Sequence, residues 1–119
     1  MSEYNYKNLD VWKESRKLVS VIYLLTKEFP IDEKFGLTSQ IKRASISIPS
    51  NIAEGIGRNS KKETRQFCFI AKGSLYEVET QLYLALDLGF VQEKEIEKVL
   101  NQITTVRKLI IGFIKYLDK

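Results

Sequence analysis

Histidine is absent from this 119-residue chain, and Cys68 is its only cysteine. Without histidine the chain lacks the most common metal ligand and general base, and a single cysteine forms neither an intramolecular disulfide nor a thiolate cluster. Zinc sites and histidine-based catalytic triads are therefore excluded. No glycine-rich phosphate loop is present either, so we expect no metal, no cofactor and no enzymatic activity.

Proline and glycine are also scarce, with two and six residues, which leaves room for only a few turns between long regular elements. No stretch approaches the roughly 18 apolar residues of a membrane span, and the first residues lack the pattern of a signal peptide. We therefore expect a soluble, cytoplasmic protein that does not contact a membrane. With 44% hydrophobic residues, the chain is expected to form a single domain over residues 1–119.

Apolar residues recur at spacings of three and four in four segments, which is typical of amphipathic helices. We expect helices at about residues 8–29, 33–57, 61–88 and 93–117. In the third segment, eight residues are expected to face inward. They are Phe67, Ile70, Ala71, Ser74, Leu75, Val78, Leu82 and Ala85.

Residues typical of helix starts and ends mark the boundaries of these segments. Pro30 ends the first helix, glycines including Gly55 end the second, and Gly89 follows the third. Ser60, with a glutamate three residues later, forms a capping box that starts the third helix. Pro49 lies inside the second segment, where we expect a kink because the periodicity continues beyond it. Short connections make neighbouring helices antiparallel, so the expected fold is an all-α, up-down-up-down four-helix bundle.

The net charge of +4 is concentrated in the middle of the chain. Residues 1–41 and 73–119 are close to neutral, whereas residues 42–72 alone carry +5. The basic residues of this segment are Lys42, Arg43, Arg58, Lys61, Lys62, Arg65 and Lys72. Such a patch would bind phosphate backbones through charge and counterion release, without reading sequence. The alternative is a solvated face that only aids solubility.

A polar seam follows the second helix beside its isoleucine stripe. Its members are Gln40, Arg43, Ser47, Asn51, Glu54 and Arg58. Polar groups so close to a core need partners, so we expect hydrogen bonds to a neighbouring helix or another subunit. Glu77 and Glu79 could pair with Arg43 or Arg58. Glu54 and Glu77 could also form an acid-base pair by residue type, but the missing catalytic groups disfavour this interpretation.

A second apolar stripe on the third helix comprises Phe69, Tyr76 and Tyr83, at intervals of seven, and Phe90 extends it beyond the helix. These positions lie away from the inward set. Exposed apolar patches usually mark interfaces, so the stripe predicts self-association. A wide core face that absorbs these residues is the alternative. Cys68 is expected to be a small buried hydrophobe.

The same residues resemble a bacterial family. The resemblance covers nearly the whole chain, and its motifs include Leu9 to Trp12, Phe29-Pro30 with Glu33, a string from Gln40 to Arg58 and a segment from Phe67 to Glu77. Within that string, Arg43-Ala44, Ser47-Ile48 and Asn51 to Gly55 are the specific elements. The chain thus resembles the four-helix bundle proteins first noticed as reading frames in intervening sequences of the large-subunit ribosomal RNA gene. Pro49 is a departure from many members.

That family is similar to the accessory protein of diversity-generating retroelements. The resemblance implies a ring-like homopentamer of bundles with a basic surface, and nucleic acid, or a reverse transcriptase in the retroelement relatives, as partner. Our leading hypothesis is a non-enzymatic, oligomeric nucleic-acid-binding protein, directed to RNA, that uses the basic segment. The alternative is a protein-protein interaction scaffold or accessory subunit with no nucleic-acid role.

Overall fold

The computed structural model describes residues 5–119, so the first four residues of the expected domain lie outside the described part. Four helices dominate, namely α1 (Asp10–Thr26), α2 (Leu37–Gly57), α3 (Lys61–Asp87) and α4 (Glu93–Leu117). Two short 3-10 helices, η1 (Tyr6–Asn8) and η2 (Ile31–Glu33), precede α1 and α2. No strand occurs among these described residues, and the expected all-α class is confirmed.

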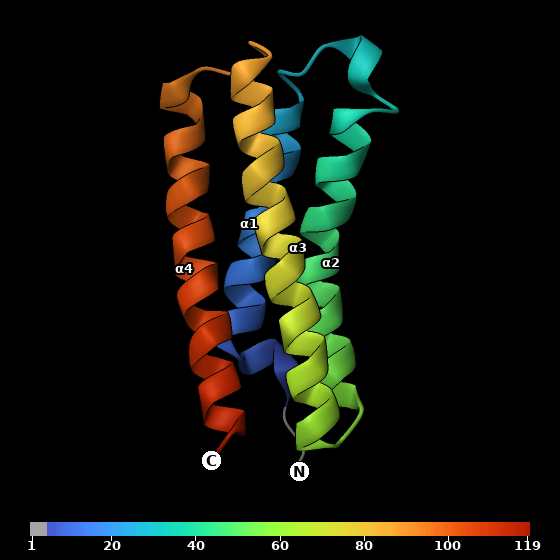
Figure 1. Cartoon of the computed structure of the whole chain (residues 1–119), viewed down its shortest axis with the longest axis vertical. Helices are drawn as coiled ribbons and strands as arrows, with labels where there is room; N and C mark the ends of the chain where they lie inside the picture. The colour runs from blue at the N-terminus through green and yellow to red at the C-terminus, as the bar shows by residue number, and fades with distance from the viewer. Residues whose placement is uncertain (1–4) are drawn as a thin grey trace.

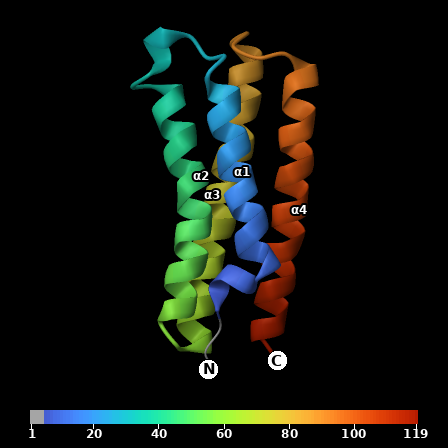
Figure 2. The same cartoon turned by 180° about the vertical axis from the view of Figure 1, so that it is seen from behind.

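The helices lie side by side along the long axis of a body that measures 46 × 25 × 20 Å. Each helix packs against two others, because α1 and α3 both contact α2 and α4. Figures 1 and 2 show the connections between successive helices at alternate ends of the molecule. The start of α1, the end of α4 and the α2–α3 turn therefore share one end, which we call the terminal end.

Aliphatic side chains from all four helices fill the space between them. The largest fully buried ones are Leu18, Ile22, Ile41, Ile48, Ile52, Leu75, Val78, Leu82, Val99, Ile103, Val106 and Ile110. Most of the inward face predicted for α3 is confirmed, but Ile70 is 51% exposed. None of the helices in the described part is long and apolar enough to cross a membrane.

The first two helices are shorter than the periodicity predicts. α1 ends at Thr26, and Phe29 is buried beyond that end, with its ring centroid 5.8 Å from that of Phe90. α2 begins only at Leu37, whose amide donates to the Glu33 carboxylate at 3.0 Å. The apolar stripe of α1 reaches Phe29 because this residue packs on the core beyond the end of the helix, whereas Ile31 and Phe35 of the connection are exposed.

The α2–α3 connection depends on two positions. α2 continues through Pro49 and past Gly55, so Gly55 is a buried position inside the helix and not its end. Asn59 follows with a φ of 54°, a left-handed conformation that asparagine tolerates, and the chain reverses there. The serine half of the predicted capping box of α3 is present, because the Ser60 hydroxyl accepts from the amide of Glu63 at 3.3 Å.

Candidate nucleic-acid interface

The seven basic residues of segment 42–72 do not form one compact patch. The Lys42 ammonium lies 4.7 Å from the centroid of the Tyr23 ring, on the side of α2 that faces α1. Arg43 lines a groove on another side of α2, between α2 and α3. The remaining five residues lie between the α2–α3 turn and the middle of α3. The helical fold thus distributes a charge cluster that is continuous in the sequence over three surfaces.

At the α2–α3 turn, acidic side chains neutralise part of the charge. The Arg58 guanidinium lies 3.1 Å from the Glu54 carboxylate and 3.8 Å from that of Glu63. In contrast, Lys61 and Lys62 are exposed and form no ion pair with any described residue. Exposed ion pairs contribute only about 0–1 kcal/mol, so Arg58 could exchange its carboxylates for phosphates at little cost.

Farther along α3, the basic residues and the aromatic stripe share one face. Phe69, Tyr76 and Tyr83 are exposed by 43%, 43% and 47%. The Arg65 guanidinium and the Lys72 ammonium lie 4.9 and 5.9 Å from the centroid of the Phe69 ring. Arg65 also pairs with Asp118, just beyond the end of α4. Two features that look separate in the sequence are therefore one surface of cations over aromatic rings.

Arg107 of α4 belongs to the same surface, although segment 42–72 does not contain it. Its guanidinium lies 5.2 Å from the centroid of the Tyr76 ring and 2.8 Å from the Glu79 carboxylate. Glu79 thus pairs across to α4, and not with Arg43 or Arg58 as the sequence led us to expect. Nothing in the local sequence of α4 marks Arg107, because its role depends on packing against α3.

Phe90 does not extend the aromatic stripe. Gly89, at a φ of 78°, turns the chain after α3, and the amide of Phe90 donates to the carbonyl of Ala85 at 2.9 Å. The Phe90 ring then packs against Phe29 and the core. The exposed apolar surface instead includes three residues outside the predicted stripe, namely Ile70, Leu84 and Leu88.

The polar seam of α2 faces α3, as a seam that needs hydrogen-bond partners should. The hydroxyl oxygens of Ser47 and Ser74 lie 2.7 Å apart and link the two helices. The Asn51 amide donates to the Ser47 carbonyl and hydroxyl at 2.8 and 2.9 Å. This part of the seam is satisfied within the chain and contributes to the α2–α3 contact.

The other end of the seam opens into a groove of about 480 Å³. Gln40, Arg43 and Glu77 line the groove. Neither Arg43 nor Glu77 forms an ion pair with a described residue. Gln81 also lines it, and its side-chain oxygen is buried without a hydrogen-bond partner among residues 5–119. Glu54 does not line this groove, so the structure does not bring Glu54 and Glu77 into it together.

Cys68 lies on the inner face of α3 and is buried. Burial raises the pKa of its thiol to about 12, because the charged thiolate is poorly solvated there. The thiol is therefore protonated at neutral pH and is not a nucleophile. Among residues 5–119, no group of three or more Cys, Asp or Glu side chains could hold a metal ion.

Comparison with known proteins places this arrangement in a family. The model of the family described as 23S rRNA-intervening sequence protein matches residues 7–112. A crystal structure from Bacteroides thetaiotaomicron VPI-5482, of a protein with unknown function from the S23 ribosomal protein family, is similar with a TM-score of 0.80 and 28% sequence identity. The similarity covers 88% of this chain and 98% of that one. No curated protein matches the chain.

Proposed function

This chain belongs to the 23S rRNA-intervening sequence protein family, and we propose that it is a non-enzymatic, oligomeric RNA-binding protein. The observation that carries the proposal is the pair Lys61 and Lys62. Both side chains are exposed at the terminal end without a carboxylate partner in the described part of the chain. Cations in this state exchange counterions for the phosphates of a nucleic acid, and that exchange needs no sequence recognition.

The family supports RNA as the polyanion, since its description refers to an intervening sequence of 23S rRNA. Arg58 and Arg65 flank the two lysines, and their exposed ion pairs are weak enough to be replaced by phosphate contacts. Lys42 and Arg43 lie on other sides of α2, and Lys72 lies farther along α3, over Phe69. We therefore assign the principal contact to the α2–α3 turn.

Self-association is the second part of the proposal. Six large hydrophobic side chains on α3 and its C-terminal cap are each more than 40% exposed. They are Phe69, Ile70, Tyr76, Tyr83, Leu84 and Leu88. Apolar surface of this extent on one helix favours an interface between copies. We propose a ring-like homo-oligomer of antiparallel up-down-up-down bundles, with five copies as the number that the family resemblance implies.

The proposed RNA contact and the proposed interface between copies overlap in part on α3. Arg65 and Lys72 lie over Phe69, so an interface that covers the aromatic stripe places these two cations at its rim. Lys61 and Lys62 lie nearer the terminal end and remain free in such an assembly. RNA binding and self-association are therefore compatible if the RNA contacts the end of the bundle.

RNA binding is tested by a salt titration with a fragment of 23S rRNA. The affinity should fall steeply with salt, and the variant Lys61→Glu, Lys62→Glu, Arg65→Glu should lower the slope of log K against log[salt] by about 2–3, because each phosphate contact contributes roughly 0.7–0.9. A matched control reverses Lys27, Lys94 and Lys98, at the opposite end. Absent binding at low salt, or equal losses in variant and control, contradicts the proposal.

A protein-binding scaffold is the second candidate function. The α2–α3 groove favours it, because no described residue donates to the buried oxygen of Gln81 or forms an ion pair with Arg43 or Glu77. A scaffold would keep its partner in the variant with three reversed charges. An RNA-binding protein would keep RNA when Gln81 is replaced by leucine, whereas a scaffold that uses the groove would lose its partner.

Oligomerisation is tested by light scattering at micromolar concentration. The mass of the wild-type protein should be a multiple of the mass of one chain, 13.8 kDa, and the multiple gives the number of copies. Replacing Tyr76 and Tyr83 with serine should shift the protein toward the monomer without loss of helical content, because both side chains are exposed and lie outside the core. A wild-type protein of monomeric mass would refute self-association.

A further inference from the structure

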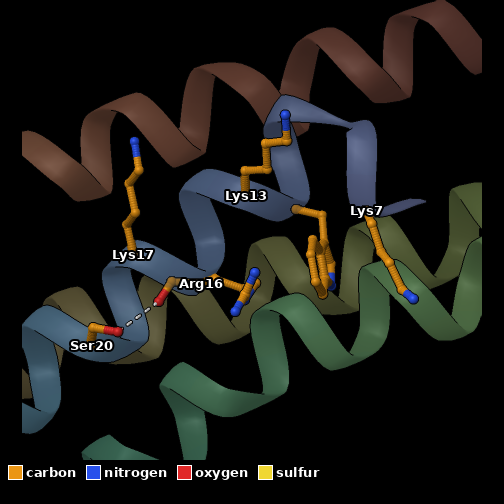
Figure 3. Close-up of a pocket in the computed structure, with 6 residues that line it drawn as sticks. Lys7, Lys13, Arg16, Lys17 and Ser20 are labelled. Carbon is orange, nitrogen blue, oxygen red and sulfur yellow. Dashed lines mark hydrogen bonds between the residues drawn. The ribbon is translucent and has the colours of Figure 1, made fainter. Parts of the chain in front are cut away.

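The outer face of α1 carries a basic surface that is not visible in the charge distribution along the sequence. A shallow pocket of about 450 Å³ lies there, and four of its six lining residues are basic (Figure 3). The lining residues are Lys7, Trp12, Lys13, Arg16, Lys17 and Ser20. Residues 1–41 are neutral overall, so only the fold separates these cations from the acidic residues of the same segment.

Trp12 holds Arg16 in place. The Arg16 guanidinium lies 4.8 Å from the centroid of the Trp12 ring, a distance at which a cation is attracted by the face of the ring. The ring of Tyr6 meets Trp12 nearly edge-on, with centroids 5.1 Å apart, and both rings pack on the core. The Arg16 side chain is thus exposed to solvent and held against the packed Trp12 ring, so a ligand that binds it does not have to order the side chain.

Acidic side chains of α1 neutralise only the Lys17 part of this surface. Glu14 pairs with Lys17 at 2.8 Å and accepts from the Gln102 side chain of α4 at 3.2 Å. Lys7, Lys13 and Arg16 form no ion pair with any residue in the described part of the chain. Three cations therefore remain without a counter-charge.

The arrangement of these cations fits an extended polyanion better than a single small ion. In Figure 3, Lys13 and Lys17 point to one side of α1, whereas Arg16 and Lys7 point to the other. The charged groups thus do not converge on one point. They are spread along η1 and the first half of α1, so several phosphates of one backbone could each contact a different cation.

The charge of the whole bundle also points to this half of the molecule. Residues 5–18, 47–74 and 105–119 make up the half at the terminal end, and they contain thirteen Lys and Arg against five Asp and Glu, a net charge of +8. The opposite half, residues 19–46 and 75–104, contains six against nine, a net charge of −3. Such a field draws a polyanion to the terminal end and orients it there.

We infer that the outer face of α1 is a second contact surface for the phosphate backbone of the RNA, made by Lys7, Lys13 and Arg16. The inference rests on the proposed RNA binding and extends its contact from the α2–α3 turn to α1. The cations of this surface contact phosphates of the RNA backbone that lie beside the phosphates contacted by Lys61 and Lys62. RNA that wraps the terminal end neutralises both surfaces, whereas RNA that contacts only the turn leaves the α1 surface free.

The test uses the full chain and the same 23S rRNA fragment. Neutralising the surface with Lys7→Gln, Lys13→Gln and Arg16→Gln should lower the salt slope by about 2–3 and the affinity at 0.1 M salt by about tenfold or more. The matched control carries Lys27→Gln, Lys94→Gln and Lys98→Gln, which remove the same charge at the opposite end. Circular dichroism of both variants should match that of the wild-type protein, since all six side chains are exposed.

The single tryptophan gives a local readout. RNA bound at Arg16 should change the emission of Trp12, and Arg16→Gln alone should reduce this change, whereas Arg16→Lys should retain more of it. If the wild-type protein binds no RNA at low salt, the proposed function and this inference both fail. If the wild-type protein binds RNA but the α1 variant matches its control, and Trp12 emission does not respond, only the α1 contact is refuted.

Discussion

α2 packs closely against α3 at Gly55. A Cβ atom added to this residue would lie 2.6 Å from the Cβ atom of Phe67 and 3.2 Å from the carbonyl oxygen of Thr64. The Thr64 hydroxyl donates to the Gly55 carbonyl at 2.7 Å, so a side chain of α3 is also hydrogen-bonded to the backbone of α2 at this contact. Any side chain at position 55 must therefore separate the helices or strain them.

The magnitude follows from two opposing effects of the substitution Gly55→Ala. Alanine gains up to about 1 kcal/mol in helix propensity over glycine. Overpacking costs typically 1–3 kcal/mol, and the upper end applies because the atoms that would clash belong to the backbone or are attached directly to it. The expected result is a net loss of about 2 kcal/mol. For a chain of 119 residues this corresponds to a drop of about 8 °C in Tm.

Gly112 provides the matched control, since it lies inside α4, is exposed, and has nothing within 4 Å of an added Cβ. Gly112→Ala should gain up to about 1 kcal/mol, or about 4 °C. Thermal unfolding followed by circular dichroism, together with urea titration, measures both variants. If Gly55→Ala is as stable as Gly112→Ala, the close packing of α2 on α3 described above is incorrect.

Three further predictions concern single side chains. Burial raises the pKa of Cys68 to about 12, so a thiol reagent at pH 8 should label it only after unfolding; rapid labelling of the folded protein would show that it is accessible. The hydrogen bond from Lys17 lowers the pKa of Glu14, so its stabilising contribution is present above the unfolded value of about 4.5 and is lost as the pH falls through the folded value. Stability measured from pH 6 to pH 3 should therefore decline less in Glu14→Gln than in the wild-type protein. Asp118→Asn frees Arg65 from its ion pair, so RNA affinity at low salt should rise by roughly two- to threefold, and a fall would show that Arg65 does not contact RNA.

The helical periodicity predicts the α-class and most of the core, because each helix buries a stripe that the sequence displays directly. One error arises where a residue packs on the core without being helical. Phe29 continues the apolar stripe of α1 beyond the end of the helix, so the sequence extends α1 too far, and residues 33–36 precede α2 although the sequence places them in it. Glycine is typical of a helix end, but a close contact between two helices, such as the one at Gly55, also requires glycine. Local sequence does not distinguish these two uses of glycine.

The candidate site is harder to predict, because the sequence shows the order of charges along the chain and not their positions on the folded surface. The surplus in segment 42–72 is real, but α2 and α3 distribute it over separate faces. Arg107 joins the aromatic surface from another helix. On α1, the Glu14 carboxylate pairs with Lys17 and accepts from Gln102 of α4, so Arg16 has no ion-pair partner among the described residues. Neutral segments can therefore carry charged surfaces.

The end-to-end charge difference also bears on how an assembly would bind RNA. Copies in a closed cyclic ring are related by rotation about one axis, so every bundle that lies along that axis points the same way. The half of each chain with net charge +8 would then lie on one rim of the proposed ring, while the aromatic face of α3 is covered between neighbours. Self-association would align the cations at Lys61 and Arg16 of successive copies along one RNA. The affinity of the assembly could then exceed that of a single bundle through multivalency alone, because each further contact forms at the high effective concentration set by the first.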